Sequence, residues 1–286
     1  MNGMKLLGRV AVFVFVATLI AAAPCARAQG GSVEFVAKAT PSSGIEEPVR
    51  GFPFYLLRES FERISAEAEA QESKPNMDAF IDKLEVSREL KAWMKKNHSV
   101  TLQGSDFIQL LKVDDVMGVP EFYTAYMQRN SGDESYNFPK PKYRMQDQQK
   151  HPEKFEKQKA EYLAAVRKYM TQFPESIDGI DLNLTDKDPS AKWKDLEAAR
   201  VKKVYQKTIG LARSKYMVAH TETDLEGHGF LRSIQPGKYW LTSLEIAANV
   251  GDARLRWDVA VTVTPGGIAN VALTNGNAIT PPYATP

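Results

Sequence analysis

Strand-like patterns stand near the two ends of this chain, and a long helical pattern separates them. Apolar and polar residues alternate over residues 33–38, and residues 49–57 form a second extended run in which Pro53 indicates an edge strand or a bulge. The period of two returns over residues 257–263, and a Pro-Gly-Gly turn then leads to a closing strand over residues 269–273. A lone two-stranded hairpin is marginal in water. We therefore expect the N-terminal strands to pair with the C-terminal ones.

The middle of the chain, residues 58–215, has the apolar spacing of half-buried helices. Pro152 suits the first turn of one helix, and Pro189 suits the start of the last helix. The large apolar residues of that last helix are Trp193, Leu196, Val204 and Tyr205.

Residues 1–28 have the features of a cleavable secretory signal peptide. Lys5 and Arg9 give it a positive start, and an apolar run over residues 10–23 follows. The A-R-A string at residues 26–28 supplies the small residues that signal peptidase accepts. An uncleaved membrane anchor is the alternative, but the run is shorter than the roughly 20 residues that span a bilayer.

Cleavage is expected before Gln29, which predicts a secreted or periplasmic mature protein without a transmembrane anchor. Cys25 raises the alternative of a lipoprotein, although Pro24 before it fits a lipobox poorly. Since Cys25 is the only cysteine, the mature chain has no disulfide, no thiol nucleophile and no thiolate metal ligand.

The charge balance of the mature chain argues against nucleic acid as a partner. The leader carries three of the 37 basic residues and no acid, which leaves 34 basic against 35 acidic residues and a net charge of −1. A chain this close to neutral offers no electrostatic case for binding nucleic acid. The full sequence, leader included, is 43% apolar and 25% charged, which is typical of a globular protein.

The most specific strings in the chain lie in its β-like ends. T-D-L-E-G at residues 223–227 is followed by Phe230 and then by P-G-K-Y-W-L at residues 236–241, and P-V-R-G stands at residues 48–51. Asp and Gly suit a tight hairpin turn because Asp accepts from backbone amides and Gly adopts positive φ. Together these strings resemble the carboxypeptidase regulatory-like, or transthyretin-like, β-sandwich domains.

The resemblance implies an α+β fold, namely a discontinuous β-sandwich of the prealbumin or immunoglobulin-like kind with a large all-α insertion. In this interpretation residues 29–57 and 216–276 form the sandwich, residues 58–215 are the helical insertion domain, and residues 277–286 are a flexible tail. The related module is an accessory part of zinc carboxypeptidases, and their catalytic motif is absent from this chain, so the resemblance carries no activity over.

The tightest cluster of metal-ligating residue types contains His220, Glu222, Asp224 and His228. Alternation along a strand places the first three on one face, and His228 would return across the turn, so a metal site is one interpretation. The other is a solvated strand that ends in an ordinary turn Asp.

Two loops are further candidates for binding. The acidic residues between Asp178 and Asp188 fail the spacing of a calcium-binding EF-hand, and a loop that caps the next helix is the preferred interpretation. Tyr136, Phe138 and Tyr143 stand among basic residues on a long loop, where they either bind a glycan or a partner chain or pin the loop to the helical domain.

The sequence therefore favours an exported, non-catalytic envelope protein with a structural, interaction or adhesion role, whose partner is an envelope protein or a glycan. One alternative is a periplasmic protein that binds a glycan or peptide. The other is a divergent hydrolase that uses a metal or carboxylates in the helical insertion. No cofactor is expected, because the chain has no H-E-x-x-H, G-x-S-x-G or Walker motif.

Export makes a direct prediction about the mature N-terminus. Mass spectrometry of the protein recovered outside the cytoplasm should give a chain that begins at Gln29, because the small residues at positions 26 and 28 direct the cut there. Recovery of intact Met1, or of a lipid on Cys25, would contradict it.

Overall fold

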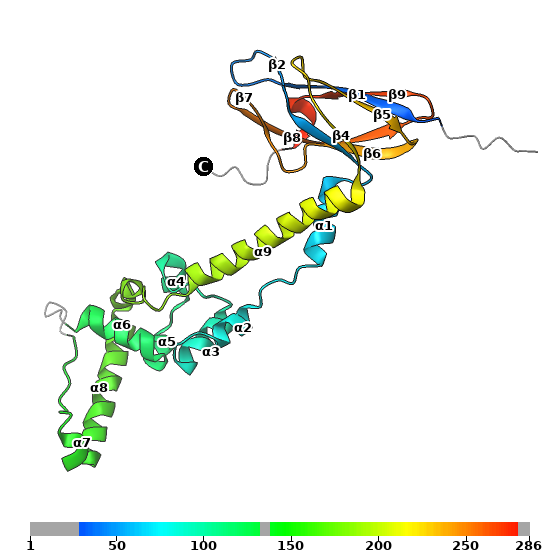
Figure 1. The fold of residues 1–286 in the computed structure, drawn as a ribbon. Helices are drawn as coiled ribbons and strands as arrows, with labels where there is room; N and C mark the ends of the chain where they lie inside the picture. The colour runs from blue at the N-terminus through cyan, green and yellow to red at the C-terminus, as the bar shows by residue number, and fades with distance from the viewer. Residues whose placement is uncertain (1–28, 132–137, 280–286) are drawn as a thin grey trace, which may run out of the picture. The chain divides into compact units, whose positions relative to one another are not determined.

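The computed structural model describes residues 29–131 and 138–279 of the chain (Figure 1). The predicted signal peptide, Tyr136 and the last part of the predicted tail lie outside the described residues. The fold is α+β, with helices and mainly antiparallel sheets. The contacts within the chain divide it into two units, a β unit made of the segments up to Phe61 and from Tyr216 on, and a helical unit over Glu62–Lys215.

Among residues 29–131 and 138–279, no helix combines the length and apolar character that a bilayer crossing requires.

The first sheet of the β unit is built around its N-terminal strand (Figure 1). Strand β1 has every second residue buried, which is the pattern of a strand with one face on a core. It pairs in antiparallel fashion with β5 and β2 and in parallel fashion with β9. The bounds of these strands are Gly31–Ala39 for β1, Glu47–Pro48 for β2, His228–Ile234 for β5 and Ile268–Leu273 for β9.

The second sheet has the order β10-β8-β6-β3-β4. Strand β7 pairs with the first residues of β8, before the part that pairs with β6. Every pairing in this sheet is antiparallel. The N-terminal strand β3 lies between β4 and β6, so both N-terminal strands β1 and β3 pair with C-terminal ones. The bounds are Pro53–Leu57 for β3, Met217–Glu222 for β4, Gly237–Thr242 for β6, Ala248–Val250 for β7, Ala253–Val263 for β8 and Ala278–Ile279 for β10.

One hydrophobic core joins the two sheets. Phe35 of β1 meets Phe54 of β3 edge to face with ring centroids 5.0 Å apart, and Phe54 also packs against Trp257 of β8. Trp257 is fully buried, and its ring N–H donates to the carbonyl oxygen of Thr274 at 3.0 Å. Buried aromatic rings from three strands therefore hold the two sheets together.

Pro53 lies in an internal strand and not in an edge strand. It is the first residue of β3, and the pairing of β3 with β6 begins only at Tyr55. Phe52 directs its N–H and C=O toward Thr223, so the nitrogen of Pro53 faces the other side, beyond the end of β6. The missing N–H thus interrupts no ladder, which explains why proline is tolerated here.

The first residues of the segment predicted as a flexible tail form a short turn and a strand. Strand β10 pairs with Arg256 and Trp257 of β8. A short 3-10 turn over Asn275–Asn277 precedes it, in which the Asn277 side chain bonds to the N–H of Thr274 and to the carbonyl oxygen of Ala272. These bonds turn the chain back toward the second sheet.

The helical unit has its own core, built from α2–α6, α8 and the 3-10 turns that follow α8. Trp93 of α3 and Phe122 of α6 meet edge to face at 5.0 Å. Pro152 occupies the first turn of α8, as predicted from the sequence. The helices are α1 Phe61–Ala70, α2 Met77–Asp82, α3 Arg88–Asn97, α4 Gly104–Leu110, α5 Val113–Gly118, α6 Pro120–Asn130, α7 Asp147–Lys150, α8 Pro152–Gln172 and α9 Ser190–Leu211, with 3-10 turns at Pro174–Ile177 and Ile180–Asn183 and a π turn at Ala212–Tyr216.

Helix α9 is more exposed than its apolar residues suggest. Leu196 and Tyr205 are 45% and 46% exposed, and only Thr208 is fully buried among its residues. Ion pairs join it to the segment around α1, because Arg200 reaches Glu69 at 3.2 Å and Lys207 reaches Glu72 at 2.9 Å. The Lys207 ammonium lowers the pKa of the Glu72 carboxyl.

Replacing Trp257 with Ala is expected to lower the free energy of unfolding of the β unit by about 3–5 kcal/mol, the usual cost of deleting a large core aromatic. Urea titration followed by circular dichroism measures it. Trp193→Ala, in the helical unit, is the matched control and should leave the transition of the β unit in place. A Trp257→Ala protein as stable as the wild type would show that this ring does not hold the sheets together.

The helical core should lose stability at high pH. Burial raises the pKa of both Tyr126 and Tyr162 to about 12, against 10 for a free tyrosine. Between about pH 10 and 12 the unfolded chain therefore ionises while the folded chain stays neutral, so stability falls as the pH rises. The fall should be shallower in a Tyr126→Phe, Tyr162→Phe double variant, whatever its stability at pH 8. Equal slopes in the two proteins would contradict this assignment.

Candidate functional site

The hairpin turn between β4 and β5 is held by Asp224. Its Oδ1 atom accepts from the backbone N–H of Glu226 at 2.9 Å and of His228 at 2.8 Å, and its own N–H donates to the carbonyl oxygen of His228 at 2.8 Å. Gly227 has φ of +83°, and a side chain there would lie 2.4 Å from the carbonyl oxygen of Ala37. The turn roles predicted for Asp224 and Gly227 are confirmed.

The four residues of the metal hypothesis are not brought together as ligands. His220 lies opposite Tyr55 in the second sheet, with the two rings 6.1 Å apart, whereas His228 lies opposite Val36 in the first sheet. The two arms of this hairpin belong to different sheets, so they separate beyond the turn. In the described part of the chain, no group of three or more His, Cys, Asp and Glu side chains is placed to hold a metal ion.

Carboxylates of the acidic loop in the helical unit hold backbone amides. Asp188 accepts from the N–H of Ser190 at 2.7 Å, at the start of α9, and from the N–H of Leu102 at 3.2 Å. Asp181 accepts from the N–H of Gly104 at 3.1 Å. These contacts agree with a loop that supports neighbouring helix starts.

The described aromatic residues of the long loop pack on the helical core. Phe138 is 8% exposed and meets Tyr169 edge to face at 5.3 Å. Tyr143 meets Phe155 in the same way at 5.2 Å. These rings pin the loop, and Phe138 is too buried to meet a ligand. Tyr136, the third binding candidate, lies outside the described residues.

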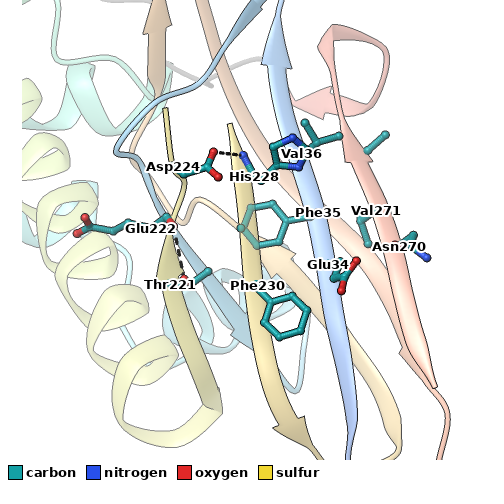
Figure 2. Close-up of a pocket in the computed structure, with 12 residues that line it drawn as sticks. Glu34, Phe35, Val36, Thr221, Glu222, Asp224, His228, Phe230, Asn270 and Val271 are labelled. Carbon is teal, nitrogen blue, oxygen red and sulfur yellow. Dashed lines mark hydrogen bonds between the residues drawn. The ribbon is translucent and has the colours of Figure 1, made fainter. Parts of the chain in front are cut away.

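A cavity of about 690 Å³ lies over the first sheet of the β unit (Figure 2). Three of the metal candidates, Glu222, Asp224 and His228, contribute to its wall, but His220 does not. None of its lining residues is Lys or Arg. The lining residues are Glu34, Phe35, Val36, Thr221, Glu222, Asp224, His228, Gly229, Phe230, Asn270, Val271 and Ala272.

A row of three unlike side chains crosses the outer face of the first sheet, the face away from the core. Glu34 of β1 lies directly opposite Phe230 of β5 on one side and Asn270 of β9 on the other. Because residues opposite one another project from the same face, an aromatic ring, a carboxylate and an amide stand side by side (Figure 2). With strands about 4.8 Å apart, the row is about 10 Å long. The next row contains His228, Val36 and Ala272, so an imidazole and two small apolar side chains line this part of the cavity.

Gly229 sets the shape of the sheet under this cavity. It lies opposite Phe35, and a side chain on it would come within 2.1 Å of the Phe35 ring. On the outer face, the Arg232 guanidinium sits over the ring of Phe230, 4.6 Å from its centroid, in a cation–π contact. Arg232 is not among the cavity's lining residues, so this contact steadies the ring from outside the cavity.

The sequence interpretation did not identify Glu34, Phe230 and Asn270 as site residues. Phe230 appears only as the strand aromatic of the resemblance, and Glu34 only as a polar position in an alternating strand. Alternation in β1 places Glu34 on the outer side of that strand. In β9 the same side as Asn270 carries Ile268 and Ala272, so no pattern marks Asn270, and the sequence does not reveal which strands are neighbours.

Comparison of the chain with protein-family models, with curated proteins and with solved structures found no match. The site is therefore interpreted from its own geometry.

Proposed function

We propose that this chain is an exported, non-catalytic interaction protein that binds a glycan on the outer face of the sheet formed by β5, β1 and β9. In this proposal the β unit is a β-sandwich of the carboxypeptidase regulatory-like kind, and the helical unit is an insertion in it. The shared core of the two sheets supports the first part. The insertion is supported by the place where the chain leaves the β unit, because it returns beside that place. There the N–H of Arg58 donates to the carbonyl oxygen of Tyr216 at 3.0 Å.

The observation that carries the glycan proposal is the row of Phe230, Glu34 and Asn270. A sugar ring has apolar C–H faces and a rim of hydroxyl groups. The ring of Phe230 offers an apolar surface on which a C–H face of the sugar can pack. The Glu34 carboxylate and the Asn270 amide offer hydrogen-bond partners for the hydroxyl groups. Six of the twelve lining residues have polar or charged side chains, which offer partners for hydroxyl groups, and about 690 Å³ lies within the usual range of volumes for a small-molecule site.

A cationic peptide is the second candidate ligand. Glu34, Glu222 and Asp224 all line the cavity, and no lysine or arginine lies among its lining residues. The two ligands differ in their response to salt, because attraction between exposed charges weakens as ionic strength rises. Binding of a neutral sugar should change little with salt, whereas binding of a lysine-rich peptide should fall.

The test is a glycan array probed with the mature protein, followed by calorimetry with the oligosaccharide that binds best. Phe230→Ala should weaken binding by about tenfold, equivalent to about 1.4 kcal/mol, because the apolar platform is lost. Glu34→Gln keeps the shape of the side chain and should weaken binding through the lost charge-assisted bonds. Leu196→Ala, an exposed apolar residue of α9, is the control and should bind as the wild type does.

Two outcomes would reject the glycan proposal. One is that no glycan binds the wild type while a lysine-rich peptide binds in a salt-dependent way. The other is a glycan that binds Phe230→Ala and Glu34→Gln as tightly as the wild type, which would place the binding surface elsewhere.

A further inference from the structure

The carboxylate of Glu34 stands without a partner on the outer face of the first sheet. The residue is half-buried on β1, and within residues 29–131 and 138–279 its side chain forms no hydrogen bond and no ion pair. Two other acids of the β unit are compensated, since Glu46 pairs with Lys38 of β1 at 2.8 Å and Glu245 pairs with Arg256. A partly desolvated carboxylate without a partner gains from a ligand that supplies a positive charge.

The described walls of the cavity do not supply that charge. Their residues include two further carboxylates, those of Glu222 and Asp224, and neither lysine nor arginine. Arg232 lies outside the cavity, where its guanidinium sits over the Phe230 ring. The cavity is therefore negative, and a bound ligand is the group that can balance Glu34.

Glu34 is the best placed of the three carboxylates. In Figure 2 its carboxylate lies between the Phe230 ring and the Asn270 amide, whereas the Glu222 side chain points away from them. Asp224 is committed to its turn, because its Oδ1 atom accepts from two backbone N–H groups. Glu34 is therefore the carboxylate that a ligand lying along the row contacts.

These charges separate three kinds of sugar. A sugar acid brings its own carboxylate next to three others, and like charges repel. A neutral sugar offers Glu34 hydroxyl groups alone. A sugar with a free amino group is protonated in weakly acidic solution, and its ammonium group adds the attraction of opposite charges to the hydrogen bond. That attraction is stronger where water is partly excluded, as it is around the half-buried Glu34.

We propose that the glycan bound on this face contains amino sugars whose amino group is free, as in oligosaccharides of glucosamine. The inference rests on the proposed function and specifies its ligand class. One ammonium group contacts the Glu34 carboxylate, and the Asn270 amide oxygen accepts from a neighbouring donor of the same sugar. The Phe230 ring packs against a C–H face of the sugar ring. Each side chain of the row thus recognises a different feature of one ligand.

Calorimetry in weakly acidic buffer tests the ligand class with a glucosamine tetramer, the same tetramer with every amino group acetylated, and tetralysine. The free-amine tetramer should bind at least about tenfold more tightly than the acetylated one at low salt, and this ratio should fall as salt is added. Tetralysine matches the side-chain ammonium groups but has no sugar ring to pack on Phe230. It should bind at least about tenfold more weakly than the glucosamine tetramer.

A pair of variants assigns the preference to Glu34. Glu34→Gln keeps the shape of the side chain and removes its charge, so the free-amine and acetylated tetramers should bind it with about equal affinity. Glu47→Gln, at an exposed acid of β2 outside the cavity lining, makes the same change in net charge and should keep the wild-type preference. Equal binding of the two sugar tetramers to the wild type, an undiminished preference in Glu34→Gln, or tetralysine that binds as tightly as the glucosamine tetramer would overturn the inference.

A crosslink identifies the carboxylate that meets the amino group. A carbodiimide activates a carboxylate, which then forms an amide with the sugar amine while the carbodiimide takes up the water that is lost. Peptide mass spectrometry should find the sugar on Glu34 in the wild type and in Glu47→Gln. Attachment chiefly at Glu222 or Asp224 would contradict the placement.

Failure of this inference and failure of the proposed function give different results. If no oligosaccharide binds the wild type, the proposed function fails and the ligand class fails with it. If the acetylated tetramer binds as tightly as the free amine, and both lose affinity in Phe230→Ala, the glycan site stands and only the amino-sugar inference is wrong.

Discussion

The pairing of β3 with β4 is the constraint on which the rest of the structure depends. It places Leu57 opposite Met217, and one residue further the N–H of Arg58 donates to the carbonyl oxygen of Tyr216. The chain therefore leaves the β unit and returns to it at neighbouring positions of one ladder. A helical unit with its own core fits between these two points without breaking any strand pairing of the sheet. Without this contact β3 would pair with β6 alone and would become an edge strand of the second sheet.

This closure has a cost in folding. Strand β1 needs β5 and β9, and β3 needs β4 and β6, so neither N-terminal strand is complete until the C-terminal segments arrive. Contacts between residues so far apart in sequence form slowly, because the chain between them loses entropy when the loop closes. The helical unit depends mostly on contacts between neighbouring helices, which close much shorter loops. Packing of Phe35, Phe54 and Trp257 in the shared core stabilises the β unit and offsets this loss of chain entropy.

Local patterns predicted what is local in this fold. Alternation revealed β1 and β8, and the turn chemistry of Asp224 and Gly227 was predicted in detail, because each depends on a few adjacent residues. The sequence did not predict which strands pair with one another or which helix faces are exposed. Nothing in β9 signals that it runs parallel to β1, and the apolar residues of α9 give no sign that Leu196 and Tyr205 are exposed. The metal hypothesis rested on His220 and His228 meeting across a turn, and the two strands enter different sheets.

The candidate site shows the same division between local and distant information. Glu34, Phe230 and Asn270 come from segments about 200 and about 40 residues apart in the chain, and each is ordinary within its own strand. They become a site only when β1 lies between β5 and β9, so the row exists only in the closed β unit. Gly229 belongs to the same arrangement, since its missing side chain makes room for Phe35, which anchors β1 beneath the cavity. The residues that hold the sheet together and those that face the cavity are thus alternate positions of the same strands. A change in register by one residue would exchange the two sets and remove both the core and the site.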